Sequence, residues 1–317
     1  MRFVFVMDPV STVIVDEDTS FALMLEAQAR GHHVDHCLAS DVGLRGQRVI
    51  ARVRRAKMQL DPLNPITLGQ AEDLDLADVD AVFIRKDPPF TDAYLWLTLV
   101  LDHLAGSTLV VNSPRGLREA NEKLYAHHFA DIVPPTIMTS HKDEILRFLK
   151  DVGGKAVIKP IDGHGGEGVF VLAEGDSNLN GLIEAVTHLG RRNAIVQSLI
   201  QEIYEEGDKR ILLVDGELLG VVGRVPSKGD IRSNVHVGGS AKSATLNDAD
   251  RRIVATIGPR LVADGLFFVG LDVIGGRLIE VNVTSPTLIQ QMSRMTGENL
   301  SATVIDRLED KVRAYGS

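Results

Sequence analysis

Short apolar runs alternate with helical segments over the first 120 residues of the chain. Four runs bounded by polar or turn residues predict buried β-strands, and they cover 2–7, 34–39, 81–85 and 108–112. Helices are predicted over 20–31, with Thr19 or Ser20 as the N-cap, and over 92–105, and Pro114 opens another. This alternation is typical of a parallel α/β sheet, in which ligands lie beyond the carboxyl ends of the strands.

Polar residues stand at the predicted strand exits and would line one rim of this sheet. They are Asp8, Arg85, Lys86, Asp87, Asn112 and Ser113. The two adjacent cations, Arg85 and Lys86, favour an anionic ligand such as a carboxylate. Asn112 and Ser113 are explained equally well as cap or turn residues.

The pattern changes after residue 119. Helices are predicted over 120–130, 142–152 and 247–264, and strands over 156–160, 169–172, 194–199, 209–214 and 217–225. The mixture predicts α+β architecture in the C-terminal part of the chain. Residues 226–243 form a long polar stretch. A loop of this length in a compact domain usually serves as an active-site lid, and its glycine and polar content predicts high mobility.

A last hairpin, over 265–286, places three oxygen-bearing side chains among apolar neighbours. Glu280 and Asn282 are two residues apart and share one face of a strand. A two-residue turn at Gly275-Gly276 would put Asp272 on the opposite face, whereas a three-residue loop over 275–277 sets it across from Glu280. If the three groups act together, the loop has three residues. Such oxygen ligands suit Mg²⁺ shared with nucleotide phosphates.

A glycine loop over 161–168 contains the spacing G-x-G-x-x-G, at Gly163, Gly165 and Gly168. A dinucleotide-binding fold requires a helix after this motif, but a β-run follows here, which argues against an oxidoreductase. A strand–loop–strand arrangement instead predicts a flap whose backbone N–H groups close over nucleotide phosphates. Lys159, between apolar residues just before the flap, would place an ammonium beside them.

Composition narrows the class of protein. The chain has 317 residues, 44% hydrophobic and 24% charged, as in an ordinary globular protein of two or three domains. A net charge of −9 argues against nucleic acid or an anionic membrane as the main partner. Cys37 is the single cysteine and lies in an apolar run, so no intrachain disulfide can form. No apolar run reaches the length of a membrane span or signal peptide, and a cytoplasmic location is expected.

Taken together, these parts resemble the ATP-grasp ligases, and more closely the bacterial glutathione synthetases. The motifs that carry the resemblance are 7–9, 85–90, 121–123, 207–210, 268–272 and 280–287. They occur in the family order between residue 3 and about residue 290, which is most of the chain. The resemblance implies an N-terminal α/β domain over 1–120, an ATP-grasp subdomain with the flap over 121–200, and a C-terminal subdomain over 201–317.

The resemblance also implies an activity and residue roles. The family joins γ-glutamylcysteine to glycine through an acyl phosphate, with ATP cleaved to ADP and phosphate. It assigns charge stabilisation to Arg210 and Arg224. The residues that it assigns to ATP binding are Lys123, Lys159, Gly163, Gly165, Gly166, Gln197, Leu199, Asp208 and Lys209. The residues that it assigns to substrate binding are Asp8, Arg85, Lys86, Asp87, Arg232, Asn234, Ser285, Pro286 and Thr287. Two Mg²⁺ ions, with Mn²⁺ as an alternative, would bind Asp272, Glu280 and Asn282. A homo-oligomer, commonly a tetramer, is implied.

Two positions depart from the family pattern. Ser240 follows Gly238-Gly239, and Gln290 stands after Ser285-Pro286-Thr287, where the family tends to carry arginines. Both arginines could contact a substrate carboxylate, so a ligase acting on a different peptide or amine stays an alternative. A nucleotide-binding regulatory protein without catalysis is a third, and the intact Lys159, Arg210 and metal set argue against it.

Overall fold

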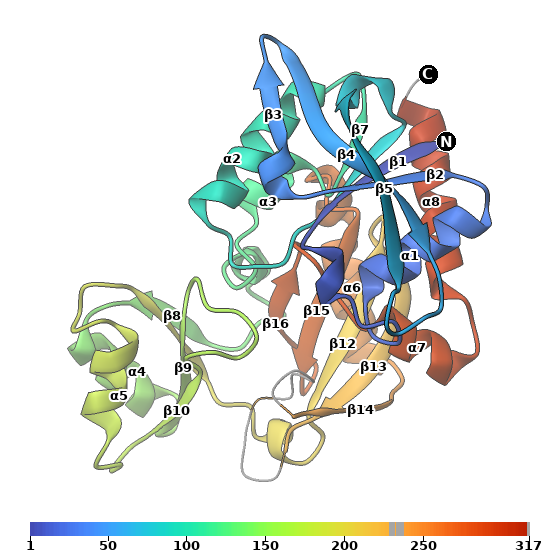
Figure 1. Ribbon diagram of the computed structural model, residues 1–317. Coiled ribbons are helices and arrows are strands. Elements are labelled where there is room, and N and C mark those ends of the chain that lie inside the picture. Colours follow the sequence, from blue (N-terminus) through green and yellow to red (C-terminus); the bar gives the residue numbers. More distant parts are fainter. Residues whose placement is uncertain (228–231, 233–237, 316–317) are drawn as a thin grey trace.

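The computed structural model describes residues 1–227, 232 and 238–315, which form three β-sheets (Figure 1). The predicted parallel strands are present in the first sheet as β1 (Arg2–Met7), β2 (His33–Cys37), β6 (Ala81–Arg85) and β7 (Leu109–Val111), neighbours in the order β2-β1-β6-β7. The α/β class predicted for this part is confirmed.

Three antiparallel strands extend the first sheet beyond β2, and the sequence pattern had not predicted them. They are β3 (Val42–Arg45), β4 (Arg48–Met58) and β5 (Ile66–Asp75). The sequence does contain a signal for β4, because apolar and polar residues alternate along much of it. In the structure Val49, Ala51 and Val53 are buried, and the arginines between Val53 and Met58 are exposed.

The helices of this part are α1 (Thr19–Ala29), α2 (Asp92–Leu101) and α3 (Pro114–Glu119). Two predictions were wrong in detail. The N-cap of α1 is Asp18, whose carboxylate accepts from Phe21 N at 2.7 Å. The helix predicted over 120–130 is a short 3-10 turn, Tyr125–His128, because Asn121 Oδ1 accepts from the backbone N–H groups that follow it and forms a separate turn.

The middle sheet has four strands in the order β10-β9-β11-β8. They are β8 (Thr136–Thr139), β9 (Lys155–Pro160), β10 (Phe170–Ala173) and β11 (Ala194–Ser198), and α4 (Lys142–Asp151) and α5 (Leu179–Val186) pack against them. This unit has a hydrophobic cluster of its own, in which Ile145 and Ile183 of the helices meet Ile158 and Val196 of the sheet.

The third sheet has the order β14-β13-β12-β15-β16. Its strands are β12 (Asp208–Val214), β13 (Glu217–Val225), β14 (Ser240–Ser243), β15 (Phe268–Ile274) and β16 (Arg277–Asn282). The helices are α6 (Asp248–Ala263), α7 (Ile289–Thr296) and α8 (Leu300–Tyr315). The stretch predicted as a loop over 226–243 therefore ends in a strand, with Ser240 paired to Val225. No helix in the described ranges is long and apolar enough to cross a membrane.

The β15–β16 hairpin contains one correction to the sequence interpretation. Asp272 does lie opposite Glu280, as predicted, but the turn has two residues rather than three, because Ile274 pairs with Arg277. Gly275 and Gly276 have φ values of +53° and +69°, the conformation of a two-residue hairpin turn. The register of the two strands shifts between Val273 and Asp272, which is a β-bulge. The bulge brings Asp272 opposite Glu280, the pairing that was expected to require a three-residue loop.

Candidate active site

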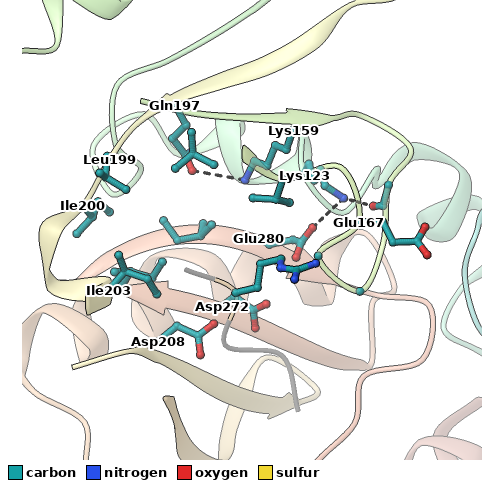
Figure 2. A pocket seen from close by; sticks show the side chains of 18 of the residues that line it. Lys123, Lys159, Glu167, Gln197, Leu199, Ile200, Ile203, Asp208, Asp272 and Glu280 are labelled. Atoms are coloured by element: carbon teal, nitrogen blue, oxygen red, sulfur yellow. Dashed lines mark hydrogen bonds and ion pairs between the residues drawn. The ribbon is translucent and has the colours of Figure 1, made fainter. Parts of the chain in front are cut away.

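A pocket lies between the middle sheet and the β15–β16 hairpin (Figure 2). We call it the first pocket. Its apolar walls are Val157, Val169, Leu199, Ile200, Ile203, Ile274 and Ile279. Its polar lining includes Lys123, Lys159, Gln197, Asp208, Asp272 and Glu280. An apolar slot that ends in charged groups suits a flat base attached to a charged chain.

Two lysine ammonium groups face the interior of the first pocket from separate elements (Figure 2). Lys123 Nζ lies 3.1 Å from Glu280 Oε1 and also donates to Gly163 O. Lys159 Nζ lies 3.5 Å from Gln197 Oε1, and its burial lowers the pKa of the lysine. Buried ammonium groups need anionic partners, so the two lysines favour a ligand with several negative charges.

The glycine loop covers one side of this pocket. A side chain at Gly163 would place its Cβ 2.6 Å from Pro160 Cγ, so the backbone turns there only with glycine. Gly166 has φ +85°, and a Cβ on it would lie 3.1 Å from Arg232 Cδ. The side chain of Arg232 therefore packs on the flap, and it lines the first pocket as well.

The predicted metal ligands lie together on the β15–β16 hairpin. Asp272 accepts from Arg210 at 2.6 Å and from Arg224 at 2.9 Å. Burial alone would raise the pKa of Asp272, but these two guanidiniums lower it below its ordinary value. Asn282 donates from Nδ2 to Gly270 O at 3.2 Å, which leaves its Oδ1 as an acceptor. Two carboxylates and an amide oxygen are hard donors that fit a divalent cation such as Mg²⁺.

A second pocket adjoins the first and shares His164, Gly165 and Glu280 with it. Arg210 and Arg224 line the second pocket near this junction. Its remaining lining includes Asp18, Thr19, Ser20, Arg85, Asp87, Glu122, Asn282, Ser285, Pro286, Thr287 and Gln291. One cavity thus receives charged groups from the N-terminal sheet and from the third sheet, beside the metal-type donors.

Family models match the chain in two parts. The N-terminal domain of prokaryotic glutathione synthetase matches residues 1–118, and its ATP-grasp domain matches residues 122–297. The glutathione synthetase of Gloeobacter violaceus is 45% identical and covers 99% of this chain and 98% of its own. That of Rhodopseudomonas palustris is 42% identical, covering 96% and 97%.

The chain belongs to the prokaryotic glutathione synthetase family.

The fold of this glutathione synthetase family member is shared with more distant ligases. D-cycloserine synthetase DcsG has a TM-score of 0.67 at 17% identity and covers 97% of this chain and 100% of its own. The D-alanine–D-alanine ligase of Bacillus anthracis has a TM-score of 0.60 at 15% identity, covering 99% and 98%. These likenesses confirm the ATP-grasp fold. Family membership makes the chain an ATP-dependent C–N ligase of glutathione biosynthesis.

Most residues that the family resemblance assigned to ATP line the first pocket of this family member. They are Lys123, Lys159, Gly163, Gly165, Gly166, Gln197, Leu199 and Asp208. Lys209 does not, because its ammonium donates to Asp250 at the start of α6 at 2.5 Å. Asp208 carries a bidentate ion pair with Arg224, in which its Oδ1 accepts from Nε at 2.7 Å.

The predicted substrate residues lie in different places, and Arg232 lines the first pocket. Arg85, Asp87, Ser285, Pro286 and Thr287 line the second pocket. Asp8 and Lys86 pair with each other at 2.7 Å outside that lining. Asn112 has a structural role. Its side-chain Nδ2 donates to Phe268 O and Val283 O, and its Oδ1 accepts from Phe268 N. Asn234 lies outside the described residues.

Several residues that line the second pocket were not predicted from the sequence. Glu122 stands beside the predicted Lys123 and accepts from Val283 N, Thr284 N and Thr284 Oγ1 at 2.9–3.0 Å, anchoring the end of β16. Burial raises the pKa of Glu122. Its position in the motif 121–123 was a usable signal. Asp18 and Thr19 carried none beyond that of helix caps, because only the tertiary fold brings the start of α1 to the second pocket.

Proposed function

We propose that the chain joins γ-glutamylcysteine to glycine, with ATP cleaved to ADP and phosphate. The observation that carries the proposal is the meeting of the two pockets at Glu280 and Gly165, with Arg210 and Arg224 on the second-pocket side of the junction. A nucleotide in the first pocket would point its phosphates at a carboxylate held in the second. Two guanidiniums at that point suit negative charge that develops during transfer.

The reaction proceeds in two displacements. An oxygen of the cysteinyl carboxylate attacks the γ-phosphorus, the bond between that phosphorus and the ADP oxygen breaks, and an acyl phosphate forms. The uncharged amine of glycine then attacks the carbonyl carbon, the carbon–oxygen bond to phosphate breaks, and the nitrogen loses a proton to solvent. Because a carboxylate is a poor acyl donor, ATP serves to provide the leaving group. Arg210 and Arg224 stabilise the charge on the transferring group.

Each pocket residue then has a role. Lys123, Lys159 and the flap glycines hold the phosphates, and the segment from Gln197 to Leu199 faces the adenine. Asp272, Glu280 and Asn282 would hold two Mg²⁺ ions, for which Mn²⁺ is an alternative. The described residues contain no cluster of three His, Cys, Asp or Glu side chains placed to hold a metal, and nucleotide phosphates would supply the further oxygen ligands that such ions take. When bound, the metal neutralises charge on the phosphates.

The acyl phosphate must be kept from water, and residues 226–243 are the segment that would do this. Arg232 supports the assignment because its side chain packs on Gly166 of the flap. We further propose the units 1–120, 121–200 and 201–317, a cytoplasmic location and a homo-oligomer, by resemblance a tetramer.

A coupled assay of ADP release over a panel of acids and amines tests this function. We expect turnover with γ-glutamylcysteine plus glycine, and loss of turnover in Asp272→Ala and Glu280→Ala with weakened binding of an ATP analogue. Asp73→Ala, which removes an exposed carboxylate paired with Arg45 outside the lining of both pockets, is the matched control. Turnover with another acid or amine alone would favour the alternative ligase. Undiminished turnover in the two variants would overturn the metal assignment.

A further inference from the structure

A third pocket lies against the first sheet and shares no lining residue with the first two pockets. Its volume is about 330 Å³, which is the size of a site for a small organic molecule. No residue assigned above to ATP, substrate or metal lines it. The apolar part of its lining is Pro9, Val10, Leu38 and Leu68, and the polar part is Ser11, His36, Asp41, Arg52 and Arg54.

Two arginines in this lining have no ion-pair partner. Arg52 and Arg54 are two residues apart on β4 and share one exposed face of the strand. In the described ranges no carboxylate lies at ion-pair distance from either guanidinium. By contrast, Arg45, Arg48 and Arg55 of β3 and β4 each pair with an aspartate of another strand of the sheet. The two arginines without a partner are thus the two that line the third pocket, which favours an anionic ligand there.

His36 adds a buried imidazole to the lining of the third pocket. It is 5% exposed and lies directly opposite Arg54 in the pairing of β2 with β4. Its Nε2 donates to Asp8 O at 3.2 Å, and no described residue forms a hydrogen bond with its Nδ1. Burial lowers the pKa of His36, and the positive charge of Arg54 acts in the same direction. The imidazole therefore stays neutral at neutral pH until an anion offsets the charge of Arg54.

The charge of the lining indicates the kind of anion. Two guanidiniums accompany one carboxylate, that of Asp41, whose Oδ2 accepts from Leu38 N at 3.0 Å. This local excess of positive charge, in a chain of net charge −9, attracts an anion to the pocket. Guanidiniums match the oxygens of a phosphate, and the apolar walls suit an organic group attached to it. We propose that the third pocket binds a small phosphate monoester, with its phosphate on Arg52 and Arg54.

A short segment connects the third pocket to the second. Residues 9–11 line the third pocket, and Thr12 and Ile14 line the second. A phosphate beside His36 favours the imidazolium, which donates a stronger hydrogen bond to Asp8 O than the neutral ring does. That bond holds the segment at its start. Resting on the proposed function, occupancy of the third pocket therefore strengthens the binding of γ-glutamylcysteine in the second.

Isothermal titration calorimetry with phenyl phosphate tests the site, with ADP and Mg²⁺ at saturation throughout to occupy the first pocket. We expect phenyl phosphate to bind. Inorganic phosphate, which lacks the apolar group, should bind at least about 10-fold more weakly, and phenol, which lacks the charge, should not bind. Absence of phenyl phosphate binding, or equal affinity for the two phosphates, would overturn the proposal.

Variants locate the bound phosphate. Arg52→Gln and Arg54→Gln should each weaken the binding of phenyl phosphate at least about 10-fold, since each removes a charge-assisted hydrogen bond. Lys57→Gln, which removes an exposed cation of β4 outside the pocket, is the matched control and should bind as the unmodified protein does. Unchanged affinity in both arginine variants would overturn the proposal.

The same titration with γ-glutamylcysteine at saturation tests the connection between the two pockets. We expect the Kd of phenyl phosphate to fall about fivefold, because coupling between two binding sites is reciprocal. His36→Phe, which keeps an aromatic ring without the hydrogen bond to Asp8 O, should abolish this difference.

The other outcomes separate the parts of the proposal. A rise in the Kd of phenyl phosphate would show competition for the second pocket and overturn the third pocket as its site. An unchanged Kd would overturn the connection between the pockets. Absence of γ-glutamylcysteine binding would instead contradict the proposed function. Should His36→Phe fail to fold, the comparison on the unmodified protein decides.

Discussion

The side chain of Gln290 donates hydrogen bonds to backbone carbonyl groups and lines neither pocket. Its Nε2 donates to Val15 O at 2.9 Å and to Asp18 O at 2.7 Å, and Arg294, one turn further along α7, donates to Asp16 O at 2.8 Å. The segment so held leads into α1 and lines the second pocket at Asp18. A glutamine at this position therefore fixes where α1 begins, and with it the part of the second pocket that Asp18 lines.

Truncation of this side chain should act on one substrate. In Gln290→Ala two hydrogen bonds of about 1 kcal/mol each are lost, so we expect the KM of γ-glutamylcysteine to rise roughly 10-fold while the KM of ATP stays unchanged. Steady-state kinetics with each substrate varied measures this, and Gln47→Ala, an exposed glutamine between β3 and β4, is the control. An unchanged KM for γ-glutamylcysteine would show that the segment keeps its place without Gln290.

Among single residues, the sequence predicted those whose position depends on a local motif. Lys159 and the glycine flap follow from a strand, a loop and a strand in succession, and both line the first pocket. The partners of Gln290 could not be found in the same way, since they lie more than 270 residues away in the chain. The position of Lys209 outside the lining of the first pocket has a related cause, because its ion pair with Asp250 depends on how α6 packs.

The β15–β16 hairpin illustrates how far elements can be predicted. The β-rich runs predicted the two strands, and the condition that three ligands act together placed Asp272 across from Glu280, which the structure confirms. The Gly-Gly turn was compatible with two loop lengths, and the sequence pattern contains no signal for the bulge that compensates for the shorter one. The turn also packs on α6, since a Cβ at Gly276 would lie 2.7 Å from Ala249 Cβ.

This contact predicts a difference between two glycines of similar backbone conformation. Gly46 has φ +67° with nothing near its Cβ position, so Gly46→Ala should lower the free energy of unfolding by about 1 kcal/mol. Gly276→Ala adds a clash between two side chains and should cost about 2–3 kcal/mol. Urea denaturation of both variants measures the difference. Equal losses would mean that the hairpin and α6 separate at little cost.

In the whole molecule the two ends of the chain are joined. Hydrophobic clusters run continuously from the first sheet into the third, with Val4 and Val6 in the same cluster as Leu271 and Val281, whereas the middle unit has its own cluster. Helix α8 packs against α1 (Figure 1). This packing could not be predicted from the sequence, because the pattern of α8 indicates a helix but not the element that it contacts.

Ion pairs at this contact make its stability depend on pH. Glu309 of α8 lies 3.1 Å from Arg30 Nη1 and 2.9 Å from His32 Nε2. Burial would raise its pKa, but His32 and Arg30 together lower it. A carboxylate whose pKa is lowered by folding stabilises the folded state above its unfolded pKa of about 4.3, and loses this contribution as the pH falls through the folded value.

We therefore expect stability to fall more steeply below pH of about 4.5 in the unmodified protein than in Glu309→Gln. Thermal unfolding between pH of about 3 and 7 measures the two curves. Glu298→Gln, an exposed glutamate between α7 and α8, is the control and should keep the original slope. Parallel curves for the unmodified protein and Glu309→Gln would show that the contact contributes nothing to acid sensitivity.

In the proposed function, the cysteinyl carboxylate is activated by direct transfer of the γ-phosphoryl group at the junction of the two pockets. Oxygen tracing tests it in one measurement. The protein is incubated with ATP, glycine and γ-glutamylcysteine whose cysteinyl carboxylate carries ¹⁸O in both positions, and the released phosphate is analysed by mass spectrometry. Direct transfer predicts one ¹⁸O atom in each phosphate released, alongside glutathione. Unlabelled phosphate accompanying glutathione would contradict it.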